Sequence, residues 1–342
     1  MAVQFGIDLL LKERLDLITG SRVGLISNAM AVTGDLTGTV DALLRQPEVE
    51  LAALFGPEHG FSGGAHDAIP VDSSTDARTG LPIHSLYGEQ LKPTARMLAG
   101  IDILVFDIPE VGVRFYTYMT TLLYAMQAAA AHGLPVIVCD RPNPIGGEVV
   151  EGPILKPGFE SFVGCGPLPV RHGLTIGELA QLFNTDWGVG CDLAVVPCAG
   201  WRRDMWFDET GLPWVPPSPG IPKLETAAVY PGTCFIEGTS VSEGRGTALP
   251  LEVLGAPWVD PWALADSLND LGLAGVRFRP AFFEPTASKW ADQPCGGVQV
   301  HVLDRDIFRP VTMGMHLIAT IKTLYANYFA WQLPHFDHLA GT

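Results

Sequence analysis

The feature that most constrains the fold is the alternation of short apolar runs with helix-like segments over roughly the first 200 residues. Apolar runs bounded by Gly, Pro or polar residues are typical of buried strands. They lie at residues 22–28, 51–56, 101–108, 134–139 and 192–197. Helix-like segments alternate with these runs, at residues 34–46, 116–132 and 175–183. This alternation predicts an α/β fold built on a doubly wound parallel sheet.

A proline-rich segment separates this pattern from a different one. Prolines at positions 213, 216, 217, 219 and 222 are expected to interrupt any regular element within residues 206–231, so we place a domain boundary there. Beyond it, strand-like runs (276–278, 297–303) mix with helix-like ones (261–271, 312–329). The expected domains are therefore an N-terminal α/β domain, residues 1–210, and a smaller α+β domain, residues 211–342.

Charge and cysteine content narrow the possible partners and location. A formal net charge of -16 argues against a nucleic-acid or anionic-membrane surface, since either needs clustered Lys and Arg. The first residues lack the pattern of a signal peptide, and no apolar run is long enough to span a bilayer. Six scattered cysteines without CxxC spacing are typical of reduced thiols. We expect a cytoplasmic protein without a cofactor, while the sequence leaves its oligomeric state open.

One strand end is the first candidate for a catalytic position. The apolar run at residues 51–56 stops at Gly56 and Pro57 and is followed at once by Glu58 and His59. In open α/β sheets, ligands bind beyond the carboxyl ends of the strands. A partly desolvated carboxylate in such a place can act as an acid or base near neutral pH. Because Glu is a poor helix cap, we predict that Glu58 is a catalytic acid or base.

The other predicted strands also end in polar residues, and a parallel sheet would bring these ends to one rim. The candidates for substrate binding at this rim are Asn28, His59, Asp107, Glu110, Asp140, Arg141 and Asn143. Asp and Asn at strand-to-helix junctions often cap the next helix instead. For Asp107 and Asp140 both interpretations stay open.

Arg114, Tyr116 and Tyr118 lie at the start of a predicted helix. Arg114 could hold a carboxylate through two hydrogen bonds, and the two tyrosines could line a sugar ring. The alternative is that Arg114 pairs with Asp107 or Glu110 while one tyrosine belongs to the core.

A glycine-rich segment in the second half, residues 237–247, carries Glu243 and Arg245. Its three glycines permit close approach of the backbone to a ligand, so these two side chains could face a binding cleft. A mobile surface loop is the alternative interpretation.

Several familiar motifs are missing from the sequence. There is no GxGxxG after the first strand, no GxxxxGK[ST], no GxSxG and no HExxH. His59 with His66 and Asp67 could hold a divalent ion, although a hydrogen-bonded histidine is the simpler interpretation. A metal-assisted hydrolase that uses Glu58, His59 and Asp107 stays open as an alternative function.

Several long sequence blocks carry a resemblance to a known family. They include GPEHGF (56–61), FDIPEVGVRFYTY (106–118), DRPNPIGG (140–147), VEGPIL (150–155) and YPGTCFIEGTSVSEGRGT (230–247). With further blocks between them, the resemblance runs from about residue 6 to residue 342. By these blocks the chain resembles the exo-β-N-acetylmuramidase family, whose founding members are the NamZ-type enzymes.

The resemblance implies a Rossmann-like N-terminal domain, a smaller C-terminal domain and an active site in the cleft between them. It also implies an exo-acting glycosidase of cell wall recycling, which releases the terminal, non-reducing β-linked N-acetylmuramic acid from peptidoglycan fragments. By motif, the family's PEHG glutamate falls on Glu58 and a second acidic candidate on Glu151. The SEGRGT motif places Glu243 and Arg245 near the same cleft.

Cleavage of a glycoside needs an acid at the leaving oxygen and a base or nucleophile for the anomeric carbon. Our hypothesis makes Glu58 the general acid, while Glu151, Glu243 or the 2-acetamido group of the sugar handles the second role. The lactyl carboxylate would be bound by an arginine, for which the candidates are Arg114, Arg141 and Arg245.

The chain departs from the family pattern in places. Glu110 stands where the family often has Asp, and residues 28–31 read NAMA where an NQTG-like turn is usual. Relatives continue beyond the position of residue 342, so a truncated C-terminal domain is one expectation. These departures leave a non-catalytic protein that binds muramyl sugars as a further alternative.

Overall fold

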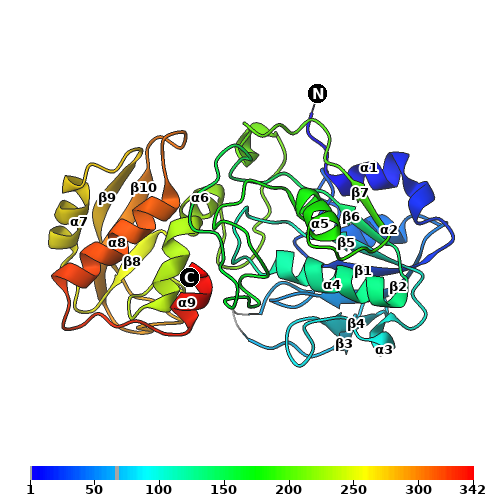
Figure 1. The fold of residues 1–342 in the computed structure, drawn as a ribbon, viewed down its shortest axis with the longest axis horizontal. Helices are drawn as coiled ribbons and strands as arrows, with labels where there is room; N and C mark the ends of the chain where they lie inside the picture. Colours follow the sequence, from blue (N-terminus) through cyan, green and yellow to red (C-terminus); the bar gives the residue numbers. More distant parts are fainter. Residues whose placement is uncertain (1, 66–68) are drawn as a thin grey trace. The chain divides into compact units, whose positions relative to one another are not determined.

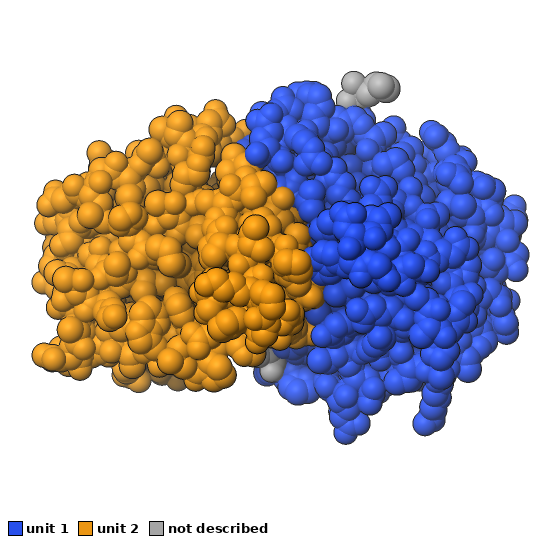
Figure 2. Space-filling view, in the orientation of Figure 1, with its two compact units in different colours: residues 1–112, 116–148, 173–222 blue, residues 113–115, 149–172, 223–342 orange. Residues whose placement is uncertain are grey.

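The computed structural model describes residues 2–65 and 69–342, which form two compact units (Figure 2). Unit 1 takes in residues 1–112, 116–148 and 173–222. Unit 2 takes in residues 113–115, 149–172 and 223–342. Unit 2 therefore includes two short segments that precede its main part, a division that sequence patterns do not reveal. The domain boundary after residue 210 stays a prediction.

Unit 1 is built around a sheet whose strand order is β3-β4-β2-β1-β5-β6-β7 (Figure 1). The strands are β1 (Arg22–Ser27), β2 (Glu50–Gly56), β3 (Ser74–Thr75), β4 (Pro82–Ser85), β5 (Ile103–Asp107), β6 (Val136–Cys139) and β7 (Leu193–Val196). All neighbouring strands run parallel except β3 and β4. The predicted doubly wound parallel sheet is confirmed, and its topological switch point lies between β1 and β5.

The helices of unit 1 follow from the predicted alternation. They are α1 (Gly6–Glu13), α2 (Thr39–Leu44), α3 (Ala95–Leu98), α4 (Tyr118–His132) and α5 (Ile176–Thr185), with 3-10 turns η1 (Leu15–Leu17) and η2 (Phe207–Glu209). Leu10 of α1 and Leu43 of α2 belong to one buried cluster with Leu25 and Val105 of the sheet. Helix α4 ends at Gly133, whose φ of 65° lies in the left-handed region that favours glycine.

Unit 2 is an α+β unit, as predicted. Its antiparallel sheet has the order β8-β10-β9. The elements are α6 (Leu224–Thr233), η3 (Cys234–Gly238), β8 (Val253–Ala256), α7 (Pro261–Asp270), β9 (Val276–Phe283), β10 (Cys295–Val302), α8 (Pro310–Leu324) and α9 (His335–Ala340). Helices α6 and α8 touch through glycines: a Cβ on Gly314 would lie 2.2 Å from the carbonyl oxygen of Gly232.

Two sequence expectations differ from the structure. Residues 206–231 are not irregular throughout, because α6 begins at Leu224 and includes Pro231. Helix α2 begins at Thr39 rather than near residue 34, since the carbonyl of Thr37 accepts the backbone N–H of Thr33 in a tight turn.

All six cysteines are free. Within the described ranges, no helix has the length and apolar character needed to cross a bilayer.

Candidate active site

Glu58 lies in a strained turn directly after β2. A Cβ on Gly56, the last residue of β2, would come within 2.6 Å of the backbone nitrogen of Phe61, so the turn is too tight for a larger residue there. The next residues include His59 with φ 68° and Gly60 with φ 71°, both left-handed. His59 is buried, and its Nδ1 lies 2.8 Å from the carbonyl oxygen of Ala65. A left-handed non-glycine residue is costly and is found most often at functional sites.

The carboxylate of Glu58 is held by a hydroxyl group. The Oγ1 of Thr117 donates a hydrogen bond of 2.7 Å to Glu58 Oε2. Thr117 is buried and is the residue that immediately precedes α4. Glu58 thus lies between the carboxyl end of a parallel strand and the amino end of a long helix. This is where α/β sheets position ligands and negative charge.

Hydrogen bonds link the ends of β1 and β5 at the topological switch point of the sheet. Ser27, the last residue of β1, pairs in register with Asp107, the last residue of β5, and its hydroxyl donates to the Asp107 carbonyl oxygen at 2.8 Å. Asn28 follows and donates from Nδ2 to the hydroxyl oxygen of Tyr118 at 3.2 Å. The predicted rim therefore exists in unit 1, with Asn28 in its interior.

Asp107 and Arg141 form a buried ion pair at this rim. Arg141 donates from Nε to Asp107 Oδ1 at 2.7 Å and from Nη2 to Oδ2 at 2.9 Å. The hydroxyl of Thr39 donates to Asp107 Oδ2 at 2.5 Å, and Arg141 Nη2 also donates to the Val32 carbonyl oxygen at 2.9 Å. Both side chains are almost inaccessible to solvent. The alternative in which Arg114 pairs with Asp107 is wrong, because Arg141 takes that place.

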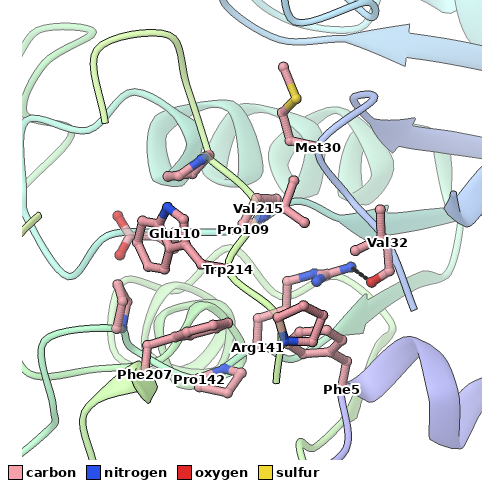
Figure 3. Close-up of a pocket in the computed structure, with 13 residues that line it drawn as sticks. Phe5, Met30, Val32, Pro109, Glu110, Arg141, Pro142, Phe207, Trp214 and Val215 are labelled. Atoms are coloured by element: carbon pink, nitrogen blue, oxygen red, sulfur yellow. Dashed lines mark hydrogen bonds between the residues drawn. The ribbon is translucent and has the colours of Figure 1, made fainter. Parts of the chain in front are cut away.

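A pocket opens beside this ion pair (Figure 3). Its walls come from the ends of β1, β5 and β6 and from the proline-rich segment before unit 2. The lining is mostly apolar: Phe5, Met30, Val32, Pro109, Pro142, Pro144, Phe207, Pro213, Trp214, Val215 and Pro217, with Glu110 and Arg141. We call it the aromatic pocket. The guanidinium of Arg141 lies 4.4 Å from the centre of the Phe5 ring, and Glu110 accepts the backbone N–H of Gly112.

Asp140 and Asn143 form hydrogen bonds with residues 174–177, at and just before the start of α5. Asp140 Oδ1 accepts the N–H of Gly177 in the first turn of α5 at 2.7 Å, and Oδ2 accepts the hydroxyl of Thr175 at 3.0 Å. Burial raises the pKa of Asp140. Asn143 donates from Nδ2 to the Leu174 carbonyl oxygen at 2.9 Å. Of the two interpretations left open for Asp140, helix capping is the one its contacts match, while substrate binding by these residues stays a prediction.

Tyr116 and Tyr118 are buried in unit 1, with ring centres 4.8 Å apart in an edge-to-face arrangement. The Tyr118 hydroxyl donates to the Pro217 carbonyl oxygen at 3.3 Å. Burial raises the pKa of Tyr116 well above its ordinary value. Both rings pack in the interior, and their role in lining a sugar stays a prediction.

Arg114 belongs to unit 2 and is fully buried there. It donates to four carbonyl oxygens: Pro153 at 2.8 Å, Leu168 at 2.9 Å, Leu339 at 2.7 Å and Ala340 at 2.9 Å. Burial lowers its pKa to about 10. The last two acceptors lie at the carboxyl end of α9, where a cation is favoured. The contacts of Arg114 thus tie backbone segments of unit 2 together.

Glu151 also binds backbone in unit 2. Its Oε1 accepts the backbone N–H of Thr312 at 2.7 Å and the hydroxyl of the same residue at 2.9 Å. Thr312 lies in the first turn of α8, where backbone N–H groups have no partner within the helix. Glu151 therefore caps α8 from a distant segment, and its catalytic role stays a prediction.

Glu243 lies in what we call the charged cluster, formed by Glu237, Glu243, Arg245 and Lys289 of unit 2. Glu243 is buried, accepts a hydrogen bond from Ser288 Oγ at 2.8 Å, and forms an ion pair with Lys289, whose Nζ lies 2.9 Å from Glu243 Oε2. Arg245 binds Glu237 Oε1 at 2.7 Å, and its Nε lies 3.8 Å from Glu243 Oε1. Two carboxylates and two cations thus compensate one another.

Sequence analysis missed three residues that these sites use. Thr117 has the sequence position of an ordinary residue before a helix. Its place between Tyr116 and Tyr118, two candidate binding residues, is the one signal that could have pointed to a functional role. Trp214 lies in the proline-rich segment, whose composition predicts only a domain boundary. Lys289 lies far from Glu243 in sequence, and no local pattern links the two.

No group of three or more His, Cys, Asp or Glu side chains in the described part of the chain is arranged to hold a metal ion. His66 and Asp67, which sequence analysis considered with His59 as ligands, lie outside the described residues.

Comparisons with known proteins agree over the whole chain. Family models described as the N-terminal and C-terminal parts of exo-beta-N-acetylmuramidase NamZ match residues 23–225 and 228–342. The peptidoglycan beta-N-acetylmuramidase NamZ of Bacillus subtilis (strain 168) is 50% identical over 340 residues, which is 99% of this chain and 82% of that protein. Two DUF1343 family proteins of Bacteroides fragilis NCTC 9343 have similar crystal structures. One has a TM-score of 0.93 at 38% identity and covers 100% of this chain and 90% of its own. The other has a TM-score of 0.79 at 31% identity and covers 100% and 89%. The chain therefore belongs to the exo-β-N-acetylmuramidase NamZ family.

Proposed function

We propose that this protein is an exo-acting glycosidase that releases terminal, non-reducing β-linked N-acetylmuramic acid from peptidoglycan fragments. The observation that carries the proposal is the 50% identity, over nearly the whole chain, to a relative named as a peptidoglycan beta-N-acetylmuramidase. The geometry of unit 1 supports it, because a carboxylate, a strained turn and an apolar pocket lie along one sheet rim.

Glu58 is the catalytic carboxylate in this proposal. It follows a parallel strand directly, and a buried hydroxyl holds it in one orientation. Acid–base catalysis of glycoside cleavage requires such a positioned carboxylate. The second role falls to Glu151, to Glu243 or to the 2-acetamido group of the sugar, and glutamine variants at the two residues separate these cases. If both variants keep activity, the acetamido group takes the role.

The aromatic pocket would receive an apolar part of the muramic acid, namely the acetyl or the lactyl methyl group. Its lining has few polar groups, so it suits a methyl group better than a ring hydroxyl. Arg141 donates from Nε and Nη2 to Asp107 and Val32, and Arg114 donates from Nη1 and Nη2 to four carbonyl groups. Arg114, Arg141 and Arg245 therefore all stay candidates for the lactyl carboxylate, and of these Arg141 lines the aromatic pocket.

The test is hydrolysis of a chromogenic β-N-acetylmuramide by the wild type, by Glu58→Gln and by Glu89→Gln. Glu89 is an exposed glutamate of unit 1 and serves as the matched control. We expect Glu58→Gln to lower kcat at least 100-fold, the lower end of what acid–base groups contribute, and Glu89→Gln to leave it unchanged.

Two results would contradict the proposal. A wild type that binds the muramide without turnover would favour a non-catalytic binding protein, and activity that is lost with a chelator would favour a metal-assisted hydrolase. Equal turnover by wild type and Glu58→Gln would remove Glu58 from the mechanism. The cytoplasmic location expected from the sequence stays a prediction, which fractionation of cells expressing the full-length protein tests.

A further inference from the structure

Thr117 has the sequence position of a helix cap but not the contacts of one. It immediately precedes α4, where a threonine side chain usually accepts a backbone N–H from the first turn. Here its φ of -66° and ψ of -18° are helical, and its side chain makes no cap hydrogen bond. The hydroxyl instead donates to Glu58 Oε2 at 2.7 Å. The side chain of Thr117 thus serves the carboxylate rather than the helix.

We propose that Thr117 is a positioning residue that holds Glu58 in its ionised form at the start of the reaction. This inference rests on the proposed function, in which Glu58 is the catalytic carboxylate. It also revises the hypothesis that Glu58 begins as the general acid.

The chemistry of the contact favours the ionised form. A hydroxyl has a single hydrogen to donate, and a hydrogen bond donated to a carboxylate stabilises its charged state. Thr117 is buried, which reduces competition from water for that hydrogen bond. Because Thr117 adjoins the first turn of α4, the Glu58 carboxylate also lies beside the positive end of a 15-residue helix.

An ionised Glu58 accepts a proton in the first step. In a hydrolysis that starts this way, Glu58 takes a proton from the attacking water while the water oxygen bonds to the anomeric carbon. The bond from that carbon to the leaving oxygen breaks, and the leaving oxygen takes a proton from the second acid–base group. This order of events leaves Glu151 or Glu243 for that role, because the 2-acetamido group has no acidic proton to give. Thr117 keeps its own proton throughout and acts only through Glu58.

The experiment compares Thr117→Val, Thr117→Ser and Thr120→Val. Thr120 lies in the same helix, and its buried hydroxyl oxygen has no hydrogen-bond partner in the described structure, so Thr120→Val is a matched loss of a hydroxyl. We expect Thr117→Val to lower kcat roughly ten-fold with KM within about two-fold, because one hydrogen bond to a charged group is lost. Thr117→Ser should keep most of the activity, and Thr120→Val should match the wild type.

The pH profile tests the ionised state. If Glu58 begins as a base, the acid limb of kcat/KM reports its protonation, and Thr117→Val should move that limb to higher pH. A shift confined to the alkaline limb would mean that Glu58 begins as an acid, which would overturn the inference. Thermal unfolding of each variant, expected within a few degrees of the wild type, shows that the changes do not come from misfolding.

A double-mutant cycle separates this inference from the proposed function. If Thr117 acts through Glu58, Thr117→Val should have no further effect on the residual activity of Glu58→Gln. Independent ten-fold losses that multiply would overturn the inference while leaving the proposed function intact. A wild type without turnover would instead overturn the proposed function itself.

Discussion

The carboxylates of Glu58 in unit 1 and Glu243 in unit 2 are both fixed by neighbouring side chains, but the chemical type of these neighbours differs. Glu58 accepts a hydrogen bond from the neutral hydroxyl of Thr117, whereas Glu243 accepts one from Ser288 and forms an ion pair with the ammonium of Lys289. A neutral donor orients a carboxylate and leaves its negative charge available to a reaction. A cation neutralises that charge and links it to the stability of the fold. We therefore expect substitution of Thr117 to change activity and substitution of Lys289 or Glu237 to change stability.

The largest expected effect on stability is that of Lys289→Met. Glu243 is only 2% exposed, so losing the ammonium leaves a buried charge with an incomplete partner. Lys289 also donates to the carbonyl oxygens of Ile236 and Thr239 at the end of η3, and both lose this charged donor as well. We expect the free energy of unfolding to fall by about 3 kcal/mol in urea denaturation.

The double variant Lys289→Met with Glu243→Gln is the control for this prediction. Removing the charge of Glu243 should restore part of the loss, because the remaining amide needs no cation. If Lys289→Met unfolds with the wild-type midpoint, the charged cluster does not stabilise unit 2, and the contrast with Glu58 fails.

The next effect concerns acid stability. Burial acts to raise the pKa of Glu237, but Arg245 and His335 outweigh it and lower the pKa to about 2. The ordinary value is 4.5, so the unfolded chain takes up the proton first as the pH falls. This contribution to stability is complete above about pH 4.5 and is lost progressively as the pH falls towards 2. We expect the loss to be on the order of 2 kcal/mol.

Glu237→Gln should remove this dependence from urea denaturation measured between pH 5 and pH 3. Glu225→Gln, at an exposed glutamate of α6, should keep the wild-type slope. An unchanged slope in Glu237→Gln would show that Arg245 does not hold Glu237 ionised.

The same contrast shows what could be predicted from the sequence. Short apolar runs and their Gly and Pro boundaries mark strand ends, so the parallel sheet and the position of Glu58 beyond β2 follow from local patterns. Partners brought together by folding do not follow from such patterns. Arg141 rather than Arg114 binds Asp107, and Arg114 binds the carboxyl end of α9, more than two hundred residues away.

Thr117 shows a second reason for the limit. Its sequence position indicates a helix cap, and only the fold reveals that its hydroxyl points to Glu58 instead. Residues 113–115 and 149–172 belong to unit 2 although the surrounding chain belongs to unit 1, which no composition shift marks. Local propensity therefore predicts elements well and assigns side-chain partners poorly.

The smallest expected effect is on substrate binding by unit 1, and it concerns Trp214 in the aromatic pocket. The Trp214 ring lies edge-to-face against Phe207, with ring centres 5.1 Å apart, and its Nε1 donates to the Pro222 carbonyl oxygen at 3.0 Å. If the pocket takes a methyl group of the sugar, Trp214→Ala should raise KM for the chromogenic muramide about five-fold, which corresponds to about 1 kcal/mol of lost apolar contact. Trp214→Phe keeps an aromatic face and should raise KM less than two-fold, while kcat should stay unchanged in both, since neither touches Glu58. A loss of kcat with unchanged KM would mean that Trp214 assists the chemical step rather than substrate binding. Catalysis at Glu58 and binding in the aromatic pocket would then not be separate functions within unit 1.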